Sequence, residues 1–75
     1  MQIQMSALVR RINRRLIPES QQLRKTRGGH DSLDLGDYWI HDLSGNYPAD
    51  TYVDPEELGR ELGCLRPSET VIDGR

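Results

Sequence analysis

A single cysteine, Cys64, in a chain of 75 residues is the feature that most constrains the fold. One thiol excludes an internal disulfide, and one cysteine with two histidines offers few ligands for a structural zinc ion. A chain this short buries only about 60% of the surface that its unfolded form exposes. Side-chain packing in one small core, with or without a second subunit, must therefore stabilise the protein.

Charge is sorted along the chain, although the formal net charge is only −2. Residues 1–30 contain seven basic residues and one acidic residue, whereas residues 31–75 contain three basic and eleven acidic residues. A low net charge also argues against a fully disordered chain. We therefore predict a folded molecule with a basic N-terminal part and an acidic C-terminal part.

Residues 5–16 predict an amphipathic helix with Ser6 as its N-cap. Pro18 should break or kink this helix, and a second helical segment could restart over 18–26 and end at Gly28-Gly29. The sequence leaves open whether Met1 or Met5 is the natural start. The predicted apolar stripe consists of Met5, Leu8, Val9, Ile12 and Leu16.

The middle of the chain predicts short strands, and the end predicts a second helix. Alternation favours strands at 32–35, 38–42 and 47–53, with a bend at 36–37 and a turn at 44–46. Pro48 cannot donate to a ladder, so the last strand should be an edge strand. Asp54 and Pro55 then match the N-cap and first position of a helix that ends at Gly63, with Glu57 at capping-box spacing.

The predicted fold class is a small single α+β domain over residues 1–65, followed by a flexible tail over 66–75. It comprises the N-terminal helix, an antiparallel β-hairpin or three short strands, and a short C-terminal helix. Leu65 should fold back on the core. The predicted core consists of Leu8, Ile12, Leu16, Leu33, Leu35, Ile40, Val53, Leu58 and Leu62.

Arginines on the first helix form one candidate binding surface. Four guanidinium groups on an exposed helix face suit phosphate, which favours RNA or DNA as a partner. The alternative is a solvated face, or arginines paired with acidic residues of the same chain or of a homodimer partner. The candidate nucleic-acid-binding residues are Arg10, Arg11, Arg14, Arg15, Arg24, Lys25 and Arg27.

Aromatic and acidic residues of the predicted hairpin form the other candidate surface. Trp39 should share one strand face with His41, while Tyr38 shares the other face with Ile40. Exposed aromatic residues are common anchors of protein interfaces, and Trp39 is the first choice here. An acidic surface could also compete with nucleic acid for a basic groove. The candidate protein-binding residues are Trp39, Tyr38, Tyr52, Asp37, Asp42 and Asp50.

Nothing in the sequence predicts an enzyme, a cofactor or a metal site. His30 and His41 each precede an aspartate, but neighbours on a strand point to opposite faces and make poor catalytic pairs. The aspartates at 50 and 54 lack the glycine and terminal glutamate of a calcium loop. No apolar stretch approaches the roughly 18 residues that span a bilayer, and an unpaired cysteine is typical of a reducing cytoplasm.

Several strings of the sequence resemble a group of small uncharacterised proteobacterial proteins that are often found on mobile elements. These strings are RINR at 11–14, LRKTRG at 23–28, LDLGDY at 33–38 and VDPEELGRELG at 53–63. Pro18 and Pro48 depart from the usual pattern of that group. The group carries no known activity, but accessory proteins of phages and integrative elements often bind host machinery, CRISPR complexes included.

We therefore expect a non-enzymatic, cytoplasmic accessory protein. The leading hypothesis is stoichiometric binding to a host protein or nucleoprotein complex, as an anti-CRISPR-like inhibitor does. The alternative is a nucleic-acid-binding module that uses the arginine face of the first helix.

Overall fold

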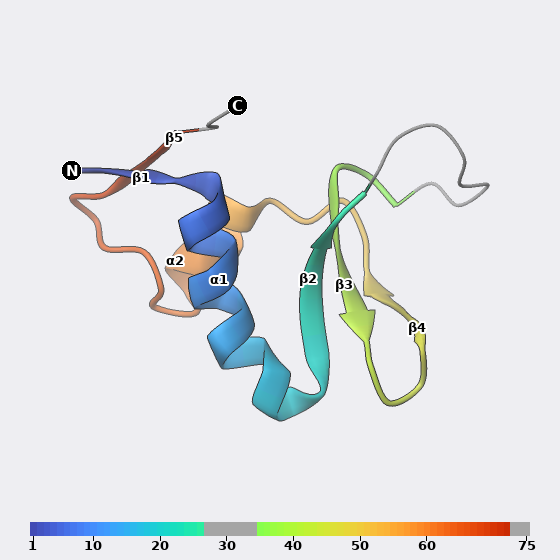
Figure 1. Ribbon diagram of the computed structural model, residues 1–75. Helices are drawn as coiled ribbons and strands as arrows, with labels where there is room; N and C mark the ends of the chain where they lie inside the picture. Colours follow the sequence, from blue (N-terminus) through green and yellow to red (C-terminus); the bar gives the residue numbers. More distant parts are fainter. Residues whose placement is uncertain (27–34, 73–75) are drawn as a thin grey trace.

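Two helices, a three-stranded antiparallel sheet and a pair of short parallel strands make up the computed structural model, which describes residues 1–26 and 35–72 (Figure 1). This arrangement confirms the expected α+β fold class. In neither helix of the described ranges do length and apolar character suffice to cross a membrane. The elements in chain order are β1 Gln2–Gln4, α1 Met5–Leu16, a 3₁₀ turn Ile17–Glu19, β2 Gln21–Lys25, β3 Tyr38–Asp42, β4 Tyr47–Asp50, α2 Pro55–Glu61 and β5 Thr70–Ile72.

Helix α1 has the predicted bounds and buries the predicted face. Leu8 and Ile12 are fully buried, and Leu16 is nearly so. The prediction of Ser6 as N-cap is wrong, because the cap position is Gln4, which makes no side-chain capping bond. The reason is that β1 runs directly into the helix, so that extended backbone at Gln4 precedes the first turn.

The prediction of a second helical segment over 18–26 is also wrong. Pro18 lies in a single 3₁₀ turn, and Ser20 then takes a left-handed backbone conformation with φ of 59°. That residue reverses the chain, and residues 21–25 form β2 antiparallel to β3. The pairing brings Leu23 opposite Ile40, and both are buried. Burial of Leu23 in the sheet outweighs the local helix preference of the segment.

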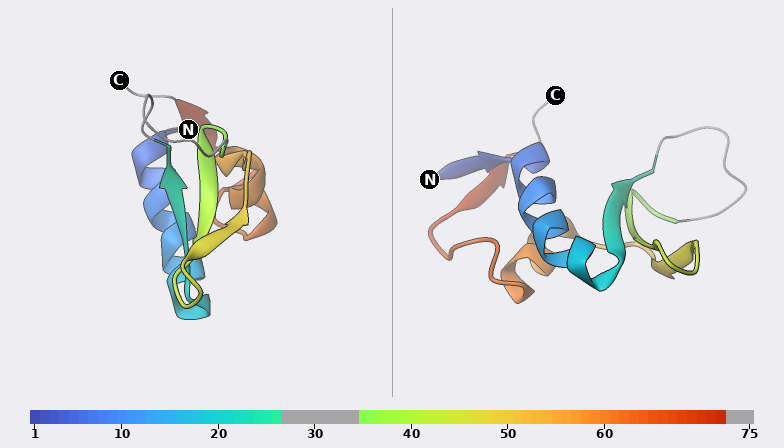
Figure 2. Two further views of the ribbon diagram at one scale, coloured as in Figure 1. Left: turned by 90° about the vertical axis from the view of Figure 1, so that its right-hand side faces the viewer. Right: turned by 60° about the horizontal axis from the view of Figure 1, so that its bottom comes forward.

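The three strands lie in the order β2-β3-β4, with both helices on one face of the sheet (Figures 1 and 2). Strand β4 is an edge strand and contains Pro48, as predicted. It ends at Asp50 and not at residue 53, because Tyr52 has a positive φ of 54°. Residues 32–34 of the strand predicted over 32–35, and the glycines at 28 and 29, lie outside the described residues, and Leu35 belongs to no strand.

Asn13 of α1 ties the helix to the outer edge of β2. Leu43 N donates to Ser20 O, and Thr26 N donates to Asp37 O. In an antiparallel ladder every second residue directs its N–H and C=O groups toward the partner strand, so those of Leu23 point away from β3. The side-chain amide of Asn13 forms hydrogen bonds with both the N–H and the C=O of Leu23. Its Oδ1 accepts from Leu23 N at 2.7 Å, and its Nδ2 donates to Leu23 O at 3.3 Å.

Helix α2 begins as its sequence predicts. Asp54 is the N-cap and accepts from the backbone N of Glu56 at 3.0 Å, and Pro55 follows at the first position. The capping bond is therefore to Glu56 and not to Glu57. Beyond the helix, Gly63 has a φ of +75°, which is typical of a residue that terminates a helix. Leu65 folds back on the core and is 5% exposed, as predicted.

The C-terminal segment 66–72 corrects the prediction of a flexible tail from residue 66. β5 pairs in parallel with β1, and Thr70 N donates to Met1 O at 2.9 Å. The carboxyl of Glu69 is buried and accepts from Arg66 N and from Arg11 of α1. Ladder bonds and an ion pair between Arg11 and the buried carboxylate of Glu69 therefore hold this segment against the start of the chain.

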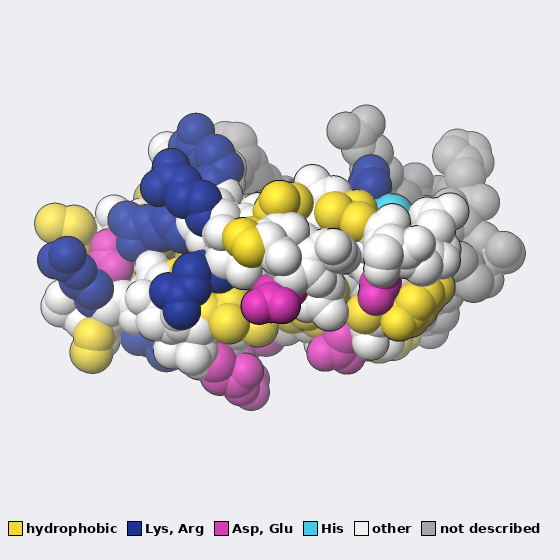
Figure 3. All heavy atoms as spheres, turned by 90° about the horizontal axis from the view of Figure 1, so that it is seen from below, with side chains coloured by type: hydrophobic (Ala, Val, Ile, Leu, Met, Phe, Trp, Pro, Cys, Tyr) yellow, Lys and Arg dark blue, Asp and Glu magenta, His cyan; other side chains and the backbone are white. Residues whose placement is uncertain are grey.

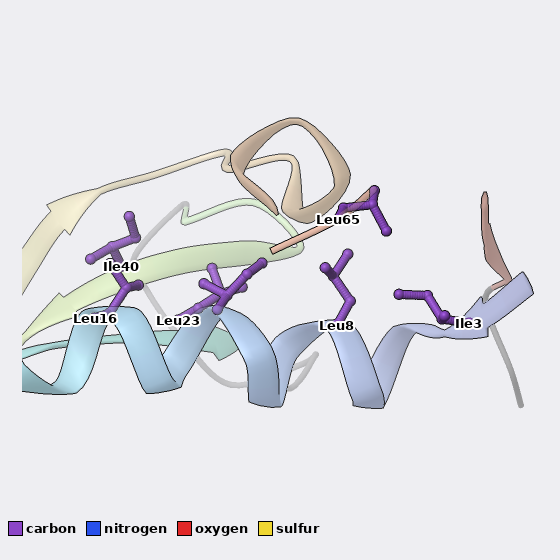
Figure 4. Close-up of a cluster of buried hydrophobic side chains, with 7 residues drawn as sticks. Ile3, Leu8, Leu16, Leu23, Ile40 and Leu65 are labelled. Carbon is purple, nitrogen blue, oxygen red and sulfur yellow. The ribbon is translucent and has the colours of Figure 1, made fainter. Parts of the chain in front are cut away.

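The hydrophobic core lies between α1, the sheet and the segment after α2 (Figure 4). Four predicted members, Leu8, Ile12, Leu16 and Ile40, belong to its buried cluster, and Leu35 is also buried. The predicted Val53, Leu58 and Leu62 pack against the cluster but are only partly buried, and Leu33 lies outside the described residues. The cluster further contains Ile3, Leu23 and Leu65.

Candidate functional site

A hollow of about 250 Å³ lies between the end of β4 and helix α2. Apolar side chains of β3, of the β4–α2 connection and of α2 line it, namely Ile40, Val53 and Leu58. Four acidic residues line it as well, and Thr51 and Tyr52 complete it. We call this surface the acidic hollow. Its carboxylates belong to Asp50, Asp54, Glu57 and Glu61.

The acidic side chains of the hollow have few partners. Asp50 accepts from Thr51 N at 2.9 Å, and Asp54 caps α2. Within the described residues, no salt bridge joins any of the four carboxylates to a cation. Four carboxylates next to apolar side chains favour the binding of a cationic group with an apolar stem, such as an arginine or lysine side chain.

Tyr52 lies at this hollow in an unusual conformation. Its φ of 54° is uncommon for a bulky residue, yet its side chain is 62% exposed. Tyr52 N donates to Leu35 O at 2.9 Å, and Val53 N donates to Tyr38 O at 2.9 Å. Only a glycine fits at position 36, because a Cβ there would lie 2.9 Å from the Tyr52 Cα. These bonds therefore fix the backbone at Tyr52, whose residue surface is largely exposed.

The other two predicted aromatic anchors lie elsewhere. Tyr38 is half-buried and packs against the core on the inner face of the sheet. Trp39 lies on the outer face, as its alternation with Ile40 predicts, and is half-buried. The Arg24 guanidinium lies 6.0 Å from the centroid of its indole, and the His41 ring lies 5.2 Å from it. Trp39 and the acidic hollow are therefore on opposite faces of β3.

The three aspartates predicted to bind a protein partner do not lie together in the structure. Asp50 lines the hollow, and Asp37 is exposed just before β3. Asp42 instead organises the turn before β4, where its Oδ1 accepts from Gly45 N at 2.8 Å and from the Ser44 hydroxyl at 2.9 Å. These bonds, the one from Gly45 first, lower the pKa of Asp42, and the Asp42 carboxylate raises the pKa of Tyr47.

Arg11, a member of the predicted arginine surface, is paired with an acidic residue of its own chain. Its guanidinium lies 3.1 Å from Glu69 Oε1 and donates to Cys64 O at 3.2 Å. Glu69 is 4% exposed, and its other partner is Arg66 N at 2.9 Å. The bond from Arg66 N, and then the charge and bonds of Arg11, lower the pKa of Glu69. Arg11 therefore neutralises a buried carboxylate of its own chain.

The remaining arginines of α1 are exposed. Arg10 and Arg14 lie one turn apart, opposite the buried face of the helix, and line a shallow depression of about 480 Å³ with Asn13, Ile17 and Pro18. We call this surface the basic depression. Ile17 is 47% exposed there. Arg15 is exposed on α1, and Arg24 and Lys25 are exposed on β2, whereas Arg27 lies outside the described residues.

The space-filling view shows how the charges are distributed (Figure 3). Most lysine and arginine side chains gather toward the end of the molecule that holds the helices, whereas most acidic side chains in this view lie between the middle of the molecule and its lower edge. The acidic hollow and the basic depression share no residue. The sorting of charge along the sequence is therefore preserved as two separate surfaces.

The described residues assemble no group of three histidine, cysteine or acidic side chains that could hold a metal ion. The ring nitrogens of His41 face Arg24 at 3.5 Å and the side-chain oxygen of Asn46 at 2.8 Å. His30 lies outside the described residues. The geometry thus leaves two charged surfaces whose carboxylates and exposed guanidinium groups form no salt bridge with any described residue.

The sequence interpretation missed part of the acidic hollow. It named Asp50 and Tyr52, but it left Asp54 out of the candidate binding residues, assigned Glu57 only to the start of a helix and gave Glu61 no role. The available signal was the spacing of these three acids, which places them along one side of a helix. No family model, no curated protein and no solved structure matches this chain.

Proposed function

We propose that the protein is a non-catalytic binding protein that docks its acidic hollow on a basic surface of another protein. The observation that carries this proposal is Tyr52, a bulky side chain held at positive φ and 62% exposed beside four carboxylates. A left-handed conformation costs roughly 1–2 kcal/mol for an ordinary residue. Strained backbone conformations cluster at active sites and ligand-binding clamps.

The partner class follows from the charge of the hollow and from the resemblance of the sequence. A cytoplasmic accessory protein of a phage or mobile element would use such a surface against the nucleic-acid groove of a host nucleoprotein complex. Its carboxylates would occupy sites that otherwise hold phosphates. Binding of this kind is stoichiometric, and it inhibits because nucleic acid and the protein compete for the same groove.

The test is affinity capture from a bacterial host with matched variants of the immobilised protein. We expect the wild type to retain one protein at equal molar amount, and Tyr52→Ala and the pair Glu57→Gln, Glu61→Gln to lose it. The control pair Arg10→Gln, Arg14→Gln should retain it. Circular dichroism checks that each variant is folded. Equal capture by all variants, or capture of nucleic acid only, would contradict the proposal.

A second candidate function is nucleic-acid binding through α1. The observation in its favour is that Arg10, Arg14 and Arg15 are exposed and form no salt bridge with any described residue. Phosphate contacts by these residues would make binding strongly dependent on salt.

Mobility shifts with single-stranded RNA and duplex DNA test this second candidate. If Arg10 and Arg14 each contact one phosphate, the pair Arg10→Gln, Arg14→Gln should lower the slope of log affinity against log salt by about 2. Arg11 is unsuitable for this experiment, because its loss would leave Glu69 buried without a cation. The absence of any shift at low salt would eliminate this candidate.

A further inference from the structure

The acidic hollow and the basic depression are complementary to each other. The acidic hollow is lined by four acidic residues together with Ile40, Val53 and Leu58, and the basic depression is lined by Arg10 and Arg14 together with Ile17 and Pro18. Each surface also exposes one large apolar or aromatic side chain, which is Tyr52 at 62% in the first and Ile17 at 47% in the second. Contact between the two surfaces would cover both side chains and pair their charges.

One molecule cannot make this contact with itself. Leu8, Ile12 and Leu16 point from α1 into the core, so Arg10 and Arg14 lie on the opposite side of that helix. The acidic hollow lies beyond the core, between β4 and α2. The matching surface must therefore come from a second copy of the chain.

We propose that the protein self-associates head to tail, with the basic depression of one copy seated on the acidic hollow of the next. The contact is heterologous, so an assembly of any length keeps one unused basic depression at one end and one unused acidic hollow at the other. The occupant is a second copy because the complementary charges and the two exposed side chains are carried by the same chain.

Self-association would also compete with the proposed docking function, because both use the acidic hollow. The inference does not rest on that function, since its test needs only the purified chain. It implies that a concentrated pool of the protein masks its own docking surface, and that dilution or salt releases it. Screening of exposed charges shortens the reach of the attraction from about 30 Å at 0.01 M salt to about 8 Å at physiological salt.

Sedimentation velocity of the full chain with two charge-reversal variants tests the inference. The first variant is Arg10→Glu, Arg14→Glu, which reverses the basic depression. The second is Asp50→Lys, Glu61→Lys, which neutralises the acidic hollow. All four positions are exposed, and a lysine at 61 lies in the last turn of α2, where positive charge is favourable. Circular dichroism establishes that both variants are folded.

The wild type should show a mass above that of a monomer that rises with protein concentration at low salt. At physiological salt its association should weaken about tenfold, the equivalent of two exposed ion pairs. Each variant should remain monomeric when tested separately, because it lacks one of the two surfaces. An equimolar mixture should form a one-to-one complex that grows no further, because one intact hollow then meets one intact depression.

A wild type that is monomeric at every concentration would overturn the inference. So would self-association that survives in both variants, or a mixture of folded variants that does not associate. Failure of affinity capture would leave these results unchanged, so the two proposals are tested separately.

Discussion

Gly59 of α2 lies at the contact between the two helices, and its replacement by alanine sets two effects of known size against each other. Alanine is favoured over glycine inside a helix by about 1 kcal/mol. The added Cβ, however, would lie 2.8 Å from the Cδ1 of Leu8, which is fully buried. Carbon atoms prefer separations of about 3.5–4.0 Å, and overpacking of a core costs about 1–3 kcal/mol.

We expect overpacking to win, because Leu8 has no exposed space into which its side chain can turn. Gly59→Ala should lower the free energy of unfolding by about 1–2 kcal/mol. For a domain of this size the Tm falls by about 4–8 °C for each kcal/mol. Urea denaturation and thermal melts followed by circular dichroism measure both quantities.

A double-mutant cycle with Leu8→Val isolates the contact, because valine lacks the δ carbon that the new Cβ would meet. We expect Leu8→Val to cost about 1 kcal/mol in the wild type and clearly less in the Gly59→Ala background. Effects that add within about 0.5 kcal/mol would refute the reasoning, as would a Gly59→Ala variant more stable than the wild type.

Three further substitutions test other contacts of the fold. Asn13→Asp keeps the acceptor for Leu23 N but loses the donor to Leu23 O, and should cost about 1–3 kcal/mol in a urea titration. Glu69→Gln should destabilise at neutral pH. Because the folded state lowers the pKa of Glu69, its stabilisation is present above the ordinary value of 4.5 and is lost as the pH falls through the folded pKa, so the variant and the wild type should converge in acid. Asp54→Ala removes the N-cap of α2 and should cost about 1 kcal/mol in thermal melts, whereas an unchanged Tm would show that α2 does not depend on its cap.

Local patterns identified the elements whose burial is periodic or whose caps are characteristic. Helix α1 shows a complete apolar stripe over twelve residues, and Asp54-Pro55 marks the start of α2. Strand β2 was mistaken for helix because the string QQLRK has one apolar residue and no alternation. Its structure is decided by pairing with β3, which a local pattern does not contain.

Long-range pairing also explains what was missed at the ends. Strands β1 and β5 have three residues each, too few to show a period, and they pair across almost the whole chain. The burial of Glu69 and its bond to Arg11 depend on that pairing. The sequence therefore could not show that Arg11 is paired while the other arginines of α1 are exposed. Asp50 and Tyr52 were candidate binding residues as members of the acidic and aromatic groups of the predicted hairpin, but the hollow that they line depends on how α2 packs.

The parallel pairing of β1 with β5 has a consequence for biosynthesis. Helix α1 and its first strand partners emerge early from the ribosome, but β1 meets its partner only after residue 72 has been made. Until then Ile3 lacks its parallel partner Val71, and Arg11 lacks the carboxylate that it binds in the finished fold. Nascent chains should therefore stay sensitive to proteases until translation passes β5. Premature termination before that point would release a product in which β1 has no partner strand.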